Sequence, residues 1–254
     1  MKNVVFIPNV DLGNNRSTPY HYSVKSWKKW CEMNNCKLVE WKDPIMDSSQ
    51  FPIIMQREWV FDILEHNNID YDQVLIVDAD TIVHPNCPNF FNETQHEYSA
   101  ILNNGCYEWV TRSVRDWGNS LFPNQPLIKT YDYFNTGFVV MNKKHKPFIE
   151  KIKELYLTRG EEIKIYRDKI KASTGQTIVN FMLQKHNIKT TKLSEAYNLQ
   201  DLHKKSLLHF PGHSWFSDEL HFLEAGWVYH FNAIPQNERH VSYWMERTYN
   251  YLYD

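Results

Sequence analysis

Apolar positions along the chain follow two patterns: short continuous runs, and stretches in which they recur every three or four residues. The runs at residues 3–10 and 71–77 are typical of strands buried on both faces, and residues 37–41 are expected to form a short second strand. Between them, residues 22–31 and 53–66 space their apolar side chains at helical intervals. Strands that alternate with helices form βαβ units, so the pattern predicts an α/β fold with a mainly parallel central sheet.

The second half of the chain carries further predicted elements but no linker. No stretch rich in proline, serine or glycine divides the sequence, so we expect a single domain. A highly charged stretch, residues 161–171, is typical of the solvated face of a helix. The predicted strands are residues 133–142, 188–193, 207–210 and 227–231, and the predicted helices are residues 147–156 and 174–183.

The composition narrows the class of protein. Lysine and arginine number 28 against 30 aspartates and glutamates, whereas nucleic-acid binders usually carry a marked basic excess, so nucleic acid is not an expected partner. Hydrophobic residues make up 42% of the chain, which predicts a folded core. The chain has only 8 glycines and none of the glycine-rich motifs that mark dinucleotide-binding Rossmann folds, P-loops or hydrolase elbows, so these classes are excluded.

The N-terminal residues do not match a targeting segment. Their apolar run is too short for a signal peptide or a membrane span, so we expect a cytoplasmic, soluble protein, peripheral to a membrane if its acceptor is lipid-linked. The cysteines at 31, 36, 87 and 106 lack zinc-ligand spacing. In a reducing compartment they are expected to be free thiols.

Two acidic residues follow the most apolar predicted strand. Residues 71–77 run directly into Asp78-Ala79-Asp80, and open α/β sheets place ligands at the carboxyl ends of their strands. Two carboxylates this close repel each other unless a cation shares them, and Mg²⁺ or Mn²⁺ prefers oxygen ligands from carboxylates and phosphates. The pair therefore indicates a metal-diphosphate site. Its spacing fits equally an acidic turn that caps a following helix.

Two histidines close strand-like runs late in the chain. His209 and His230 are each followed by a phenylalanine at the end of such a run. A histidine at the end of a strand, on the ligand side of the sheet, is a candidate further ligand for an octahedral metal site. The alternative for either residue is a structural, hydrogen-bonded histidine.

Five motifs in order carry a family resemblance. They are VLIVDADTIV at 74–83, YFNTGFVVMN at 133–142, GQTIVNFML at 175–183, AYNLQ at 196–200 and a terminal strand that ends in His-Phe. This order resembles the nucleotide-sugar glycosyltransferases of the GT-A fold, especially the family of glycogenin and the bacterial galactosyltransferases. The resemblance implies one GT-A domain over residues 1–254, with a nucleotide-binding half at about 1–105 and an acceptor-binding half at about 106–254.

The resemblance also implies a metal site. Asp78 and Asp80 match the D-x-D pair that holds Mn²⁺, or Mg²⁺, against the donor diphosphate, and a late histidine is the third ligand. His230 is preferred for its strand and for Arg239, a cation that follows it and is expected to face phosphate. His209 remains a candidate because its HFPG sequence resembles the His-x-x-Gly of the family.

Four further residues match donor-binding positions of the family. Pro8 and Asn9 lie where its first loop meets the nucleoside base. Arg57 matches a basic residue that approaches the nucleotide, and the alternative for it is a surface salt bridge. Asn135, in the Asn-Thr-Gly entry to the strand at 133–142, is assigned to the donor site, and Gly137 suits a close backbone approach there.

One departure from the family affects the mechanism. This chain has Gly175-Gln176 where the family commonly has Asp-Gln. Gln176 is able to hydrogen bond sugar hydroxyls but is no base. If the reaction inverts the anomeric centre, a carboxylate must take the acceptor proton, and the candidates are Asp132, Glu108 and Asp116.

The expected function is transfer of a sugar from a nucleoside-diphosphate sugar, with a UDP-sugar favoured, to a hydroxyl of a glycan or other acceptor. One alternative is a nucleotidyltransferase or pyrophosphatase, because these enzymes also bind a nucleotide or diphosphate through paired acidic residues and a divalent cation. Another is a non-catalytic carbohydrate-binding module.

Overall fold

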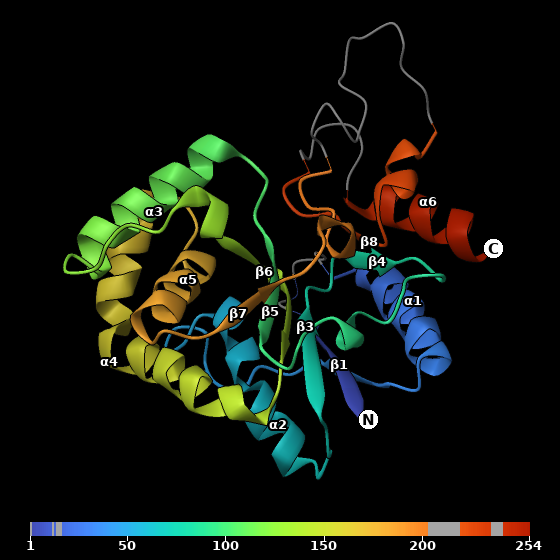
Figure 1. Ribbon diagram of the computed structural model, residues 1–254, viewed down its shortest axis with the longest axis horizontal. Coiled ribbons are helices and arrows are strands. Elements are labelled where there is room, and N and C mark those ends of the chain that lie inside the picture. The colour runs from blue at the N-terminus through green and yellow to red at the C-terminus, as the bar shows by residue number, and fades with distance from the viewer. Residues whose placement is uncertain (1, 12, 14–16, 203–218, 235–240) are drawn as a thin grey trace, which may run out of the picture.

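The computed structural model describes residues 2–11, 13, 17–202, 219–234 and 241–254 (Figure 1). Its strands are β1 (Asn3–Pro8), β2 (Lys37–Trp41), β3 (Gln73–Val77), β4 (Thr81–Val83), β5 (Tyr98–Leu102), β6 (Phe134–Met141), β7 (Thr190–Lys192) and β8 (Val228–His230). Its α-helices are α1 (Tyr20–Met33), α2 (Val60–His66), α3 (Tyr107–Leu121), α4 (Lys146–Ile170), α5 (Gly175–Lys185) and α6 (Val241–Tyr253).

A six-stranded sheet with the order β2-β1-β3-β6-β5-β7 forms the centre of the molecule. β6 is antiparallel to both of its neighbours, and all other pairs are parallel. The predicted mainly parallel sheet is therefore confirmed, with β6 as its one reversed strand. Every residue of β3 and β6 is buried, as expected for central strands covered on both faces.

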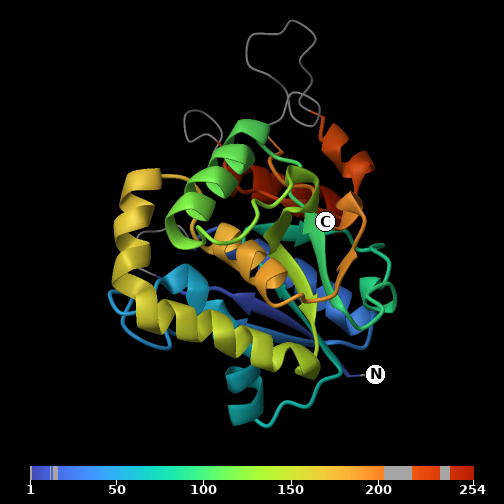
Figure 2. The ribbon, with the colours of Figure 1, turned by 60° about the vertical axis from the view of Figure 1, so that its left-hand side comes forward.

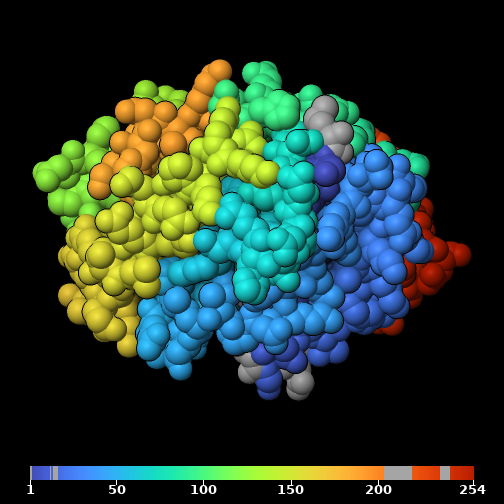
Figure 3. Space-filling model, turned by 90° about the horizontal axis from the view of Figure 1, so that it is seen from below, coloured from blue at the N-terminus to red at the C-terminus, as the bar shows by residue number. Residues whose placement is uncertain are grey.

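The two faces of this sheet pack against different helices (Figure 2). Val4 of β1 and Val74 of β3 belong to the core shared with α2, α3, α4 and α5, whereas Val5 and Leu75 belong to the core that includes Trp27 and other residues of α1. Successive side chains of a strand point to opposite faces, which explains why residues 4–7 of β1 and 74–77 of β3 are apolar without interruption. On the first face α4 lies beside α2 (Figure 3), joined by the ion pair of Lys153 and Asp62 at 2.6 Å.

A second, two-stranded sheet extends the molecule on the side of α1. β4 and β8 pair antiparallel, with Thr81 opposite His230. Helix α6 contacts β4 and α1 (Figure 1). The Trp27 indole of α1 donates a hydrogen bond to Thr81 Oγ1 at 3.0 Å, so the segment after β3 is fixed to the buried face of α1.

The structure corrects several predicted element boundaries. The helix predicted at 53–66 begins as a 3₁₀ helix, η1 (Ile53–Trp59), before α2. The helical stretches at 147–156 and 161–171 form one helix, α4, with non-helical dihedral angles at Arg159. β5, α3 and α6 were not predicted, although residues 110, 114, 117 and 121 of α3 are apolar at helical spacing. The strand predicted at 207–210 lies outside the described residues.

The remaining structural expectations concern cysteines and the membrane. All four cysteines are free, as predicted. Among the described residues, no helix combines the length and apolar character needed to cross a membrane.

We predict that Trp27→Phe lowers the free energy of unfolding by about 1–3 kcal/mol, because a buried hydrogen bond is lost and a smaller ring leaves space in the core. Urea denaturation measures this. Tyr251→Phe is the control, since Tyr251 is 73% exposed, and it should change stability by less than about 0.5 kcal/mol. Equal stabilities of the two variants would contradict the role given to Trp27.

Candidate active site

The turn between β3 and β4 carries the two acidic residues. β3 ends at Val77 and β4 begins at Thr81, so Asp78 and Asp80 lie at the carboxyl end of the central strand. The Asp78 backbone N–H donates to Gly137 O at 2.9 Å, and Thr81 Oγ1 donates to Asp78 O at 2.8 Å. The following element is a strand. The alternative of an acidic cap on a following helix is therefore wrong.

β8 brings His230 to the same place. Its Nε2 atom lies 3.2 Å from Asp80 Oδ1 and 3.7 Å from Asp78 Oδ2. One potential ligand atom from each of the three residues lies within 4.8 Å of the others. Burial by itself lowers the pKa of His230, but the carboxylates of Asp80 and Asp78 outweigh this effect, and the pKa is raised. His209 lies outside the described residues.

The backbone after His230 makes a tight turn. Ala233, three residues later, has a φ angle of 53°, in the left-handed region that glycine adopts most readily. The chain therefore turns sharply three residues after His230, with alanine in a conformation that favours glycine.

Gly137 closes the cluster from β6. A Cβ atom there would lie 2.5 Å from His230 Cε1, 2.7 Å from Asp78 Oδ2 and 2.9 Å from Asn135 Oδ1. A side chain at this position would collide with two of the three clustered residues. The close backbone approach expected at Gly137 is therefore present.

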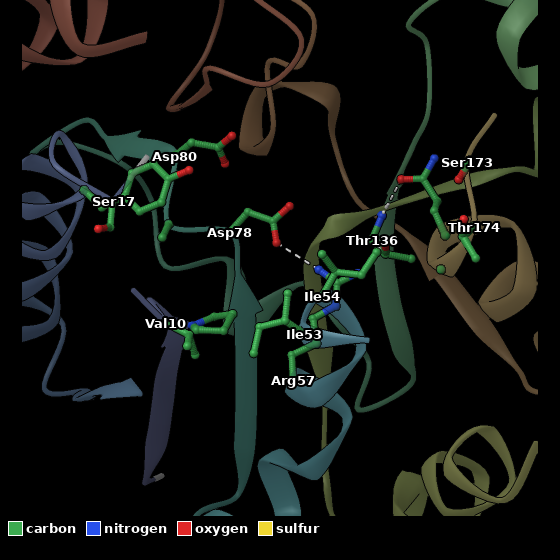
Figure 4. Close-up of a pocket in the computed structure, with 15 residues that line it drawn as sticks. Val10, Ser17, Ile53, Ile54, Arg57, Asp78, Asp80, Thr136, Ser173 and Thr174 are labelled. Atoms are coloured by element: carbon green, nitrogen blue, oxygen red, sulfur yellow. Dashed lines mark hydrogen bonds and ion pairs between the residues drawn. The ribbon is translucent and has the colours of Figure 1, made fainter. Parts of the chain in front are cut away.

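Arg57 reaches the cluster from η1 (Figure 4). Its Nη1 donates to Asp78 Oδ1 at 2.8 Å and its Nη2 donates to Thr136 Oγ1 at 2.7 Å. The side chain is only 11% exposed, which excludes the alternative of a surface salt bridge. Burial by itself lowers the pKa of Arg57, but Asp78 and Glu58 raise it above its ordinary value, so the guanidinium remains charged.

A cleft of about 410 Å³ lies above these residues (Figure 4). Its volume is in the range of small-ligand sites. The lining residues come from the end of β1, the start of α1, η1, the Asp78–Asp80 turn, β6 and the start of α5: Pro8, Val10, Ser17, Tyr20, Ile53, Ile54, Arg57, Asp78, Ala79, Asp80, Thr136, Ser173, Thr174, Gly175 and Gln176.

Gln176 lines this cleft from the first turn of α5. Its Oε1 accepts a hydrogen bond from the Thr136 backbone N–H at 3.1 Å. Its Nε2 is buried near Tyr133 without a hydrogen bond of normal geometry to a described group. At the preceding position, a Cβ atom on Gly175 would lie 2.4 Å from Met55 Sδ, so Met55 fills the space that the aspartate of the family would need.

Several predicted residues lie away from the cleft. Asn9 is not among its lining residues, and its Nδ2 donates to Glu40 Oε1 at 2.8 Å. Asp132 is exposed and pairs with Lys192 at 2.8 Å. The other two carboxylates considered, Glu108 and Asp116, pair with Arg112 and Arg115 on α3. Arg239 lies outside the described residues.

The structure also adds residues that the sequence did not indicate. Tyr20, Ile54 and Thr136 line the cleft, and Asn198 contacts His230. Only Thr136 and Asn198 lay inside a motif. Tyr20 and Ile54 lie outside every motif and are common residue types. Only the folding of α1 and η1 around the cleft brings them to the site.

We predict that Gly137→Ala lowers the free energy of unfolding by about 1–3 kcal/mol, because the added methyl group overpacks the cluster. The matched control is Gly160→Ala, where a Cβ atom would meet nothing within 4 Å. Gly160 lies in α4, where the Gly160→Ala change should leave the free energy of unfolding unchanged or raise it by up to about 1 kcal/mol. Urea denaturation compares them, and a Gly137→Ala variant as stable as the control would refute the close approach.

Comparison with known proteins adds information on the fold. No protein-family model and no curated protein sequence matches the chain. Among solved structures, a glycosyltransferase involved in the glycosylation of the major capsid of PBCV-1 has a TM-score of 0.63 at 8% identity, over 97% of this chain and 100% of that one. The galactosyltransferase LgtC, in complex with donor and acceptor sugar analogs, has a TM-score of 0.51 at 13% identity, over 99% and 96%.

A third solved structure is the glycosyltransferase GlyE of Streptococcus pneumoniae TIGR4, with a TM-score of 0.55 at 16% identity. The match covers all of this chain but 61% of GlyE, so the chain spans less than two thirds of that protein. At such identities the similarity establishes the fold. The chain therefore has the GT-A fold of these glycosyltransferases, as its motifs predicted.

Proposed function

We propose that the protein is a metal-dependent glycosyltransferase that moves a sugar from a nucleoside-diphosphate sugar, with a UDP-sugar favoured, to a hydroxyl of a glycan or other acceptor. The observation that carries the proposal is the convergence of Asp78, Asp80 and His230 beside a ligand-sized cleft. The shared fold of solved glycosyltransferases supports it.

The three clustered residues suit a divalent cation. Two carboxylates and one imidazole nitrogen are ligands that Mn²⁺ accepts readily and Mg²⁺ accepts less readily. Without a cation or a proton between them, these electron-rich atoms repel each other at the distances observed. A bound cation supplies Lewis acidity for the leaving diphosphate.

The chain's own groups hold and orient the donor. Arg57 binds Asp78 Oδ1 through Nη1 and Thr136 Oγ1 through Nη2. The other carboxylate oxygen, Asp78 Oδ2, then faces His230. The positive guanidinium also adds favourable charge beside a diphosphate. Pro8 and Val10, at the end of β1, form one end of the cleft and suit the nucleoside. Gln176, which lines the cleft from the first turn of α5, is proposed to hydrogen bond a sugar hydroxyl.

The cleft also fits the division of the chain into two functional halves. Pro8, Arg57 and Asp78 come from the proposed nucleotide-binding half, about residues 1–105. Thr136 and Gln176 come from the proposed acceptor-binding half, about 106–254. Among the described residues that line the cleft, the only carboxylates are Asp78 and Asp80. Asp132 pairs with Lys192 away from the cleft, so we do not propose it as the catalytic base.

The first prediction from the proposed function concerns turnover of the sugar donor. With Mn²⁺ and a panel of UDP-, GDP- and TDP-sugars, we expect slow release of UDP from a UDP-sugar, and loss of release when the metal is chelated. Chromatography of the nucleotides measures both. Hydrolysis of a nucleoside triphosphate or free diphosphate would instead indicate a nucleotidyltransferase or pyrophosphatase. Glycan binding without release from any donor would indicate a carbohydrate-binding module.

The second prediction concerns the metal ligands. Asp80→Asn should reduce metal-dependent binding of the UDP-sugar by roughly 100-fold or more, since loss of even an outer partner of a metal ligand typically costs 10–100-fold. Calorimetric titration with and without Mn²⁺ measures this, with circular dichroism as the test of folding. Asp70→Asn, which removes a carboxylate paired with Lys2 and Lys143, is the control and should bind normally. Normal turnover in Asp80→Asn would refute the site.

A further inference from the structure

Three buried amide side chains connect the centre of the sheet to His230. Asn135 lies on β6, and Asn198 and Gln200 lie on the segment that follows η5 (Glu195–Tyr197). All three are at most 4% exposed, and His230 is 2% exposed. Buried amides are costly unless their donors and acceptors are paired, so a group of them at one place needs an explanation.

The local backbone explains why these side chains converge. Residues 198–201 run beside β8, where Leu199 forms a parallel bridge with Tyr229. The His230 N–H donates to Leu199 O, and the Leu199 N–H donates to Val228 O. In such an extended segment alternate side chains share a face, so Asn198 and Gln200 point the same way while Leu199 points into the apolar core.

The hydrogen bonds form one continuous chain. Gln200 Nε2 donates to Leu102 O at 2.8 Å, and Asn135 Nδ2 donates to Gln200 Oε1 at 2.8 Å. Asn198 Nδ2 donates to Asn135 Oδ1 at 3.1 Å, and that oxygen also accepts from the Gly137 backbone N–H at 2.7 Å. The last link joins Asn198 Oδ1 and His230 Nδ1, which are 3.0 Å apart.

Backbone groups fix the direction of every link. The Gly137 N–H is only a donor, so the Asn135 atom that faces it is the oxygen, and its nitrogen faces Gln200. The Leu102 carbonyl is only an acceptor, so it fixes Gln200 in the same sense. Asn198 must therefore turn its nitrogen to Asn135 and its oxygen to the imidazole.

This direction decides the tautomer of His230. Because Asn198 offers an oxygen, the Nδ1 atom of His230 carries the hydrogen and donates it. In the neutral ring the lone pair is then on Nε2, the atom 3.2 Å from Asp80 Oδ1. The ring is thus held with its electron pair toward two carboxylates, an arrangement that a cation stabilises and that a ring of the other tautomer would not supply.

We propose that Asn198, Asn135 and Gln200 are positioning residues that hold His230 as the Nδ1–H tautomer with Nε2 presented to the cation site. The role of that site rests on the proposed function, whereas the tautomer does not. The inference also changes the assignment of Asn135. Its oxygen and nitrogen are both engaged within the protein, so it orients His230 through Asn198 instead of contacting the donor.

The first experiment reads the tautomer directly. In metal-free protein labelled with ¹⁵N-histidine, long-range proton–nitrogen correlation at alkaline pH, where the ring is neutral, should show the hydrogen of His230 on Nδ1. In Asn198→Leu the signal should change to the Nε2–H form. Asn198→Asp keeps an acceptor for Nδ1 and should keep the Nδ1–H form. A wild-type ring protonated on Nε2, or an unchanged ring in Asn198→Leu, would overturn the proposal.

The second experiment reads the cation. Mn²⁺ titration followed by the electron paramagnetic resonance of free Mn²⁺ should show affinity reduced about 10–100-fold in Asn198→Leu and less in Gln200→Leu, which leaves the contact with His230 intact. Asn142→Leu is the matched control, because Asn142 is a buried asparagine after the far end of β6 that bonds His96 O. It should destabilise the fold and leave Mn²⁺ affinity unchanged.

The two readouts separate the two proposals. A wild-type protein with the Nδ1–H ring that binds no Mn²⁺ would support the positioning chain and refute the metal-dependent function. Mn²⁺ affinity that falls equally in Asn198→Leu, Asn198→Asp and Asn142→Leu would show a merely structural role and overturn the positioning chain.

Discussion

Repulsion between two neighbouring carboxylates, Asp78 and Asp80, and its compensation by positive groups is the constraint on which the arrangement of this protein depends. Asp78 and Asp80 meet at the end of β3, partly exposed in the cleft, beside the buried side chain of His230. Arg57 compensates part of the negative charge by binding Asp78. The chain of amide side chains from Leu102 to His230 orients the imidazole so that the lone pair on Nε2 of the neutral ring points toward the carboxylates. Two carboxylates at one place need a positive partner, which is a proton on His230 in the free protein or, under the proposed function, a divalent cation.

The rest of the fold brings these groups together from distant parts of the chain. β3 lies at the centre of the sheet and supplies the acidic turn, while β4 leaves the sheet and pairs with β8, so that Thr81 stands opposite His230. β6 runs against its neighbours and passes the cluster at Gly137, the position without a side chain. Trp27 fastens Thr81 to α1. The positions of the site residues are therefore fixed by buried strands and by the buried face of α1.

Much of the fold followed from local pattern because buried central strands carry continuous apolar runs. β1, β3 and β6 were predicted from such runs, β2 from a short β-branched and aromatic stretch at the edge of the sheet, and the D-x-D turn from its place after β3. Strand β5 was missed because its YSAIL sequence holds only three consecutive apolar residues, and α6 was missed although Val241, Trp244, Met245, Tyr249 and Leu252 recur at helical spacing. The reversed direction of β6 is a matter of topology, which local periodicity does not encode.

At the site, the sequence by itself determined the acidic pair, the basic residue Arg57 and a short choice of histidines, because these are local residue types in a recognisable order. Only the tertiary structure decided that His230 joins the pair, that Asn135 is engaged with Gln200 and Asn198, and that Asn9 turns to Glu40. The physical reason is strand register. Which side chain stands opposite Thr81 depends on how β8 buries its faces against distant parts of the chain, and no local pattern around His230 carries that information.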